Sequence, residues 1–299
     1  MKRDTKSLDF NSRNLLIKHI VVTLLKSNCN LLYITLSCKK TENKHMKLIH
    51  LFSLFLGCCC SISAQVKLHS HNDYEQARPF YLAYEHKFAS IEADIFLVNG
   101  ELYVAHDKEK IDSTRTFKAL YLNPIVELMQ KQNNKIYSDG TPLQLLIDLK
   151  TDHQSTLPVL EKQLLEHKAC FDSNNNSGAV KVVISGSIPP ADLFDKYASI
   201  IFFDGRPQRS YTPKQQDRLG MISDSYANHA KWPGYGAISE TDKQNIETFV
   251  SNAHQMNIPA RLWGCPDNEA AWDQFITLNF DFINTDKIQQ LRQYIDTKK

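Results

Sequence analysis

The chain has 299 residues, and its 35 basic and 33 acidic side chains give a formal net charge of only +2. The charges are unevenly spread, because residues 1–64 hold ten basic and three acidic residues, whereas residues 65–299 hold 25 basic and 30 acidic ones. An acidic body without a basic patch excludes nucleic acid as the expected partner. The length of this body, residues 65–299, suits a single domain.

The basic leader contains the pattern of a secretory signal that begins at an internal methionine. Met46 opens a short basic region, an apolar run follows over residues 48–57, and a stretch of small residues ends at Ala64. We therefore predict a signal peptide over 46–64 and export to the periplasm or the extracellular space. Residues 1–45 have no role in this arrangement and are expected to lie outside the native product.

Two alternatives for the leader stay open. Either residues 15–25 form a helix or anchor in a longer leader, or Cys58 is the lipid anchor of a lipoprotein. The apolar run is too short to span a bilayer comfortably, so we expect no stable membrane insertion. Beyond the leader only Cys170 and Cys265 remain, too few for a disulfide framework or a structural zinc site.

Short apolar runs alternate with amphipathic stretches along residues 65–299. Continuous apolar runs are typical of strands buried on both faces, and residues 157–167 and 242–256 have the apolar spacing of helices. Eight alternating units favour a single domain built as a closed (β/α)8 TIM barrel. Residues 205–220, rich in Pro, Gln and Arg, do not fit a helix. The predicted strands are 66–69, 91–96, 143–149, 180–185, 200–204, 221–225, 260–263 and 282–285.

The first two strands end in residues that suggest metal-assisted acid–base chemistry. His69 and His71 end the first strand. Glu92 and Asp94 lie two residues apart on the second, so their carboxylates share one face. Two carboxylates held this close repel each other unless a cation lies between them.

Asn99 and Gly100 give the strongest short-range signal for a β-hairpin after the second strand. Pairing outward from that turn sets residue 94 opposite residue 105 and brings His106 beside the carboxylates. We therefore expect a hairpin extension of the barrel that delivers a histidine to the site.

Later strands add further candidates at the carboxyl ends, where barrels place their chemistry. Asp148 and Lys150 offer the cation another oxygen and the substrate a positive charge. Arg206 brings an arginine to the mouth, and Trp263 ends a strand where it can stack on a substrate. The alternatives are a loop salt bridge for Arg206 and a core position for Trp263.

The order of these residues resembles the glycerophosphodiester phosphodiesterase superfamily of phospholipase C-like phosphodiesterases. It is most similar to the branch that opens with His-Ser-His-Asn-Asp-Tyr, here residues 69–74. That branch includes bacterial secreted proteins and a fungal family named for altered inheritance of mitochondria. The resemblance covers residues 66–286 and implies a metal-dependent phosphodiesterase on a TIM barrel.

The resemblance also implies roles for single residues. Carried across, Glu92, Asp94 and Asp148 match the metal ligands, His71 and His106 the catalytic histidines, and Lys150 a phosphate-binding lysine.

Three departures from the superfamily pattern stand out. The usual His-Arg-Gly is His71-Asn72-Asp73, the usual Pro-Glu-Asn-Thr is replaced over residues 79–82, and the third metal ligand is Asp148 instead of Glu. The first catalytic histidine is ambiguous between His69 and His71. The spacing of eight residues to the proline at 79 favours His71.

The expected cofactor is a hard divalent cation, Ca²⁺ or Mg²⁺, on carboxylate oxygens. One histidine would deprotonate a hydroxyl or a water and the other would protonate the leaving oxygen, each transfer being worth roughly 10²- to 10⁴-fold. Asn72 and Lys150 would hold the phosphate of a small, soluble phosphodiester.

Two rival functions remain. The first is a zinc hydrolase of the amidohydrolase or polymerase-and-histidinol-phosphatase type, which His69 and His71 would suit. The second is a non-catalytic phosphate- or sugar-phosphate-binding barrel, favoured by the missing Arg and Glu.

Overall fold

The structure is a computed structural model that describes residues 5–8, 20–26, 32–38 and 66–298. The chain divides into two units, residues 1–62 and 63–299. In the first unit three strands form an antiparallel sheet: β1 (Thr5–Leu8), β2 (Ile20–Lys26) and β3 (Leu32–Cys38).

The two leader alternatives fare differently. A helix over residues 15–25 is wrong for its second half, since residues 20–25 belong to strand β2. The predicted signal peptide over 46–64 and the lipoprotein alternative at Cys58 lie outside the described residues.

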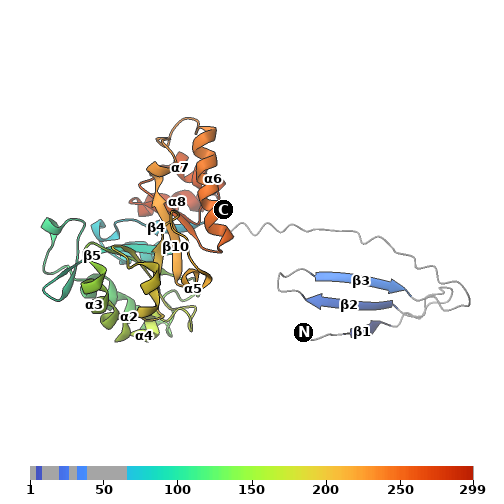
Figure 1. Ribbon diagram of the computed structural model, residues 1–299, viewed down its shortest axis with the longest axis horizontal. Helices are drawn as coiled ribbons and strands as arrows, with labels where there is room; N and C mark the ends of the chain where they lie inside the picture. Colours follow the sequence, from blue (N-terminus) through green and yellow to red (C-terminus); the bar gives the residue numbers. More distant parts are fainter. Residues whose placement is uncertain (1–4, 9–19, 27–31, 39–65, 299) are drawn as a thin grey trace, which may run out of the picture. The chain divides into compact units, whose positions relative to one another are not determined.

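The second unit is a nearly closed barrel of eight parallel strands (Figure 1). Each of the eight predicted apolar runs forms one of these strands, which confirms the predicted TIM-barrel architecture. The strands pair in the order β11-β10-β9-β8-β7-β5-β4-β12. Their bounds are β4 (Lys67–Ser70), β5 (Ser90–Val98), β7 (Gln144–Leu149), β8 (Lys181–Gly186), β9 (Ile201–Gly205), β10 (Leu219–Ser225), β11 (Ala260–Trp263) and β12 (Phe282–Thr285).

Side chains close the seam between β11 and β12, the two ends of the strand order. The amide of Asn284 donates to the carbonyl of Leu262 at 2.8 Å, and Nε of Arg261 donates to Oδ1 of Asn284 at 3.0 Å. A buried asparagine and a buried arginine thus bridge strands where the backbone ladder does not.

The predicted hairpin is also present. Strand β6 (Glu101–Val104) runs antiparallel to β5, with residue 98 opposite 101 as expected. Asn99 and Gly100 both have positive φ, 50° and 83°, as the turn of a two-residue hairpin requires.

Helices follow most of the strands, and Figure 1 shows α2, α3 and α4 on one side of the barrel and α6, α7 and α8 on another. The two predicted helices are α3 and α6, and the one helix within residues 205–220 is the single turn α5. Within the described part of the chain no helix has the length and apolar character needed to cross a membrane. The α-helices are α1 (Tyr81–Glu85), α2 (Asn123–Lys131), α3 (His153–Leu165), α4 (Lys168–Phe171), α5 (Pro213–Gln216), α6 (Glu240–Gln255), α7 (Glu269–Thr277) and α8 (Ile288–Thr297). The shorter helical segments are η1 (Asp73–Glu75), η2 (Lys108–Lys110), η3 (Lys118–Leu122), η4 (Ala191–Lys196) and η5 (Tyr226–Asn228).

The barrel interior changes from apolar to polar along the strands. A separate apolar cluster fills the barrel interior toward the amino ends of the strands and consists of Leu146, Val183, Phe202, Met221 and Phe282. Two residues further along each of these strands, on the same face, comes a polar side chain. As a result, polar and charged side chains line the carboxyl end of the barrel, where the active site usually lies in this fold. These polar residues are Asp148, Ser185, Asp204, Ser223 and Asn284.

Candidate active site

Three carboxylates meet at the carboxyl ends of β5 and β7. The register sets Asp94 directly beside Asp148, and one oxygen each from Glu92, Asp94 and Asp148 lies within 4.8 Å of the others. Burial, with a smaller contribution from the neighbouring carboxylates, raises the pKa of Asp94 and raises that of Asp148 to about 6. The sequence therefore predicted correctly that these three side chains come together.

The chemistry of this cluster fits a hard divalent cation. Oδ1 of Asp94 is buried and has no hydrogen-bond partner among the described residues. A buried carboxylate oxygen without a donor is costly, and carboxylate oxygens are the ligands that Ca²⁺ and Mg²⁺ prefer. Within the part of the chain that is described, the cluster that could hold a metal contains no histidine, which argues against the zinc-hydrolase alternative.

Glu92 is held by two residues deep in the lumen. Its Oε2 accepts hydrogen bonds from Nε2 of His69 at 2.8 Å and from Nη2 of Arg261 at 2.6 Å. Although burial works in the opposite direction, Arg261 and then His69 keep the pKa of Glu92 below its usual range. Oε1 of Glu92 is left as the oxygen that can face a cation.

His69 is fully buried, and both of its ring nitrogens are engaged, the second by the hydroxyl of Ser90 at 2.8 Å. Burial lowers the pKa of His69 to about 3, so the ring stays neutral. His69 therefore positions Glu92 and is out of reach of a substrate.

His71 lies just beyond the carboxyl end of β4, on the loop that follows, and its side chain is 29% exposed. Nδ1 donates to Oδ1 of Asp286 at 2.9 Å, which leaves Nε2 as the nitrogen that can meet a substrate. Burial opposes the effect, but the hydrogen bond with Asp286 raises the pKa of His71. Asp286 is itself fixed, because its backbone N–H donates to the Asp267 carboxylate at 3.1 Å.

Tyr74 links the remaining parts of the site. Its hydroxyl lies 2.6 Å from Oδ2 of Asp94, 2.7 Å from Oδ1 of Asn72 and 3.1 Å from Nδ1 of His106. His106 also approaches Oδ2 of Asp94 at 3.4 Å, so the hairpin delivers it where the sequence predicted.

A buried aspartate fixes the loop that carries His71 and Asn72. Asp73 accepts hydrogen bonds from the Ser70 hydroxyl, the Phe80 backbone N–H and the Tyr121 hydroxyl. The loop turns sharply between these contacts, since Asn72 has a positive φ of 46°. Asp73 is thus a structural anchor beneath the site.

The other candidates occupy the rim. Nζ of Lys150 lies 2.9 Å from Oδ2 of Asp94 and 3.5 Å from Oδ2 of Asp148. Arg206 points inward and pairs with Oδ2 of Asp204 at 2.7 Å, so the predicted mouth arginine is also a salt-bridged one. Trp263 is 44% exposed, so the core alternative for it is wrong.

Sequence reasoning missed Arg261, Tyr74 and Asp267 as parts of the site. Arg261 carried a readable signal, because a charged residue stood within the apolar strand 260–263. Tyr74 and Asp267 carried none, since their roles depend on partners brought close by the fold.

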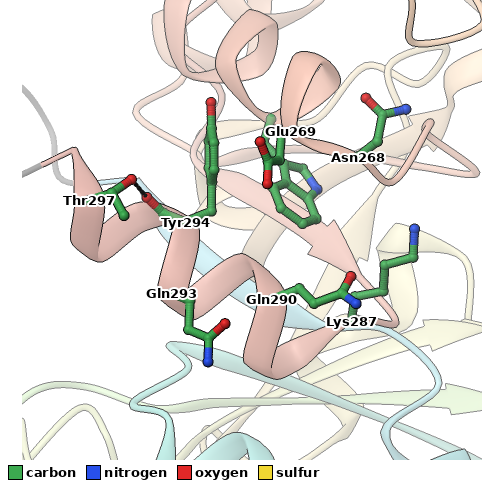
Figure 2. Close-up of a pocket in the computed structure, with 8 residues that line it drawn as sticks. Asn268, Glu269, Lys287, Gln290, Gln293, Tyr294 and Thr297 are labelled. Atoms are coloured by element: carbon green, nitrogen blue, oxygen red, sulfur yellow. Dashed lines mark hydrogen bonds between the residues drawn. The ribbon is translucent and has the colours of Figure 1, made fainter.

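A cavity of about 640 Å³ is lined by residues of α7 and α8 and the segments just before them (Figure 2). Trp272 and Lys287 line it and both bind Asp267, through the carboxylate and the carbonyl respectively. No predicted site residue lines this cavity, so it is not the candidate active site.

Comparisons with known proteins agree with this architecture. Residues 59–204 match the family described as the AIM6-like phosphodiesterase domain. The chain is 28% identical to the altered inheritance of mitochondria protein 6 homolog of Arthroderma benhamiae over 74% of this chain and 83% of that protein. It is 25% identical to altered inheritance of mitochondria protein 6 of Eremothecium gossypii over 76% and 69%.

The fold is similar to the crystal structure of a glycerophosphodiester phosphodiesterase from Parabacteroides distasonis. The TM-score is 0.51 at 12% sequence identity, covering 78% of this chain and 98% of that one. Residues 59–204 are therefore similar to the AIM6-like phosphodiesterase domain, and the barrel is similar in fold to a glycerophosphodiester phosphodiesterase.

Proposed function

We propose that this protein is a metal-dependent phosphodiesterase that cleaves a small glycerophosphodiester-like substrate. The observation that carries the proposal is the convergence of the three-carboxylate cluster, Lys150 and two accessible histidines at one end of the barrel. Glu92, Asp94 and Asp148 would hold the cation, Ca²⁺ or Mg²⁺. When bound, it would offset the charge that develops on the phosphate oxygens.

The two histidines divide the proton transfers. His71 keeps its proton beside Asp286 and acts as the general acid that protonates the leaving alcohol oxygen. Tyr74 donates to Asp94, so its oxygen accepts from Nδ1–H of His106 and leaves Nε2 of His106 as the general base. His106 takes the proton from water or a neighbouring hydroxyl as the new P–O bond forms and the old one breaks.

Lys150, Asn72 and Arg206 would hold the phosphate. Nη1 of Arg206 is engaged with Asp204 and Nη2 donates to the Ser185 hydroxyl at 3.4 Å, so Nε and the second N–H of Nη2 would meet an anion. Trp263 would contact the alcohol part of the substrate at the rim.

The test is turnover by the full chain with and without Ca²⁺ or Mg²⁺. His71→Ala and His106→Ala should each lower kcat by roughly 10²- to 10⁴-fold, whereas His69→Ala should act through metal affinity and stability. Asp94→Asn should lose bound metal and activity together. Normal turnover by folded His106→Ala protein would refute the proposed chemistry.

We further propose that the protein is exported and acts on a soluble phosphodiester. The leader pattern supports export, and the acidic body supports a small substrate over an anionic bilayer. Exported protein should begin at Gln65, which N-terminal sequencing would check. Initial rates on glycerophosphocholine and glycerophosphoinositol should exceed those on phosphatidylinositol vesicles, and the reverse order would indicate a phospholipase.

A further inference from the structure

Lys150 occupies an unusual place for a residue that is proposed to bind substrate. Its ammonium group contacts Asp94 and Asp148, two of the three candidate metal ligands, and its side chain is only 25% exposed. The backbone N–H of Lys150 donates to the carbonyl of Ile95 at 2.9 Å, which fixes the base of the side chain between β5 and β7. The flexible part of Lys150 is the four-carbon chain above this anchor.

The charges of the cluster are already partly balanced. Arg261 neutralises Glu92 at 2.6 Å, and Lys150 is the cation closest to Asp94 and Asp148. A divalent cation on Asp94 and Asp148 would stand a few ångströms from the ammonium group if Lys150 stayed in place. Like charges at that distance repel each other strongly at the edge of a protein, where the effective dielectric constant is well below that of water.

We propose that Lys150 is a mobile counter-ion that competes with the divalent cation for the carboxylates and moves to the substrate phosphate when that cation binds. Resting on the proposed function, this inference gives Lys150 two successive partners. It first pairs with Asp94 and Asp148, and metal binding then displaces it toward the phosphate. Metal and anion therefore bind with positive coupling, and by linkage each strengthens the other by the same factor. A fixed structural lysine would instead support the carboxylates, and its removal would weaken metal binding.

The experiment measures Mn²⁺ binding to the full chain, through the electron paramagnetic resonance signal of free Mn²⁺. Lys150→Met should bind Mn²⁺ at least tenfold more tightly than the wild type, and Lys150→Arg should not. The matched control is Lys131→Met, which removes a lysine from an exposed ion pair with Glu127 on α2 and should leave affinity within twofold. Lys150→Gln carries the same prediction as Lys150→Met should the latter fail to fold.

A second arm uses glycerol 3-phosphate, a monoester that a diesterase does not cleave, as the anion probe. It should raise the Mn²⁺ affinity of the wild type by fivefold or more, and that of Lys150→Met by much less. Equal or weaker Mn²⁺ binding by folded Lys150→Met would overturn the counter-ion role while leaving the metal site standing. Failure of every variant to bind Mn²⁺ would remove the metal-dependent function as well.

Discussion

Gly186→Ala should damage the metal site through the backbone of a neighbouring strand. Gly186 ends β8 beside β7 with a φ of +70°, and an added Cβ would overlap Oδ1 of Asp148. The Cβ would also come within 2.5 Å of the Leu149 carbonyl oxygen and 2.8 Å of the Leu149 nitrogen. The alanine therefore meets both a candidate ligand and backbone that cannot move away cheaply.

Gly236→Ala is a matched control for this change. Gly236 has nearly the same φ, +69°, but an added Cβ there meets nothing within 4 Å. Both variants should lose about 1–2 kcal/mol of unfolding free energy from the left-handed backbone. Gly186→Ala should lose about 1–3 kcal/mol more, the usual cost of forcing atoms into a packed region.

Urea unfolding of both variants measures this difference, and Mn²⁺ titration measures the displacement of Asp148. We expect Gly186→Ala to lose metal affinity and Gly236→Ala to keep it. Equal stability and equal metal affinity for the two variants would refute the close approach of Gly186 to Asp148.

Further predictions concern buried charges and pH. Arg261→Met leaves Glu92 without its strongest partner and should cost about 3–5 kcal/mol of unfolding free energy, while adding Glu92→Gln to that variant should recover part of the loss in urea unfolding. Asp286→Asn should lower the pKa of His71, which NMR titration would measure. It should also shift to lower pH the limb of the pH–rate profile along which activity falls as the general acid loses its proton. Because the folded-state pKa of His71 is raised, the stability that Asp286 contributes should be fully present below about pH 6.5 and vanish as pH rises through the raised pKa. Asp73→Ala, which strands three hydrogen-bond donors, should cost about 3 kcal/mol, with Asp73→Asn less harmful.

The strands and the carboxylate cluster could be predicted because their signals are local. Side-chain alternation alone puts Glu92 and Asp94 on one face, and the turn at Asn99 sets the register that returns His106. Eight apolar runs then required a sheet buried on both sides, which fixed the carboxyl ends of the strands as one surface. The site followed from geometry that residue types impose over a few neighbours.

The charge balance of the site could not be predicted, because it depends on how the barrel closes. Arg261 on β11 lies 169 residues from Glu92 on β5 in the sequence, and the closing of the barrel brings the two within hydrogen-bond reach. The fold also buries His69 on β4 and leaves His71 partly exposed on the loop that follows, a distinction that the spacing of the two histidines does not show in the sequence. Once Arg261 is in place, Glu92 is a carboxylate with one oxygen committed and one free, and Asp94 keeps a buried Oδ1 without a hydrogen-bond partner among the described residues while its Oδ2 contacts Lys150 and Tyr74. Metal affinity in this barrel should therefore depend most on Asp94 and on the lysine beside it.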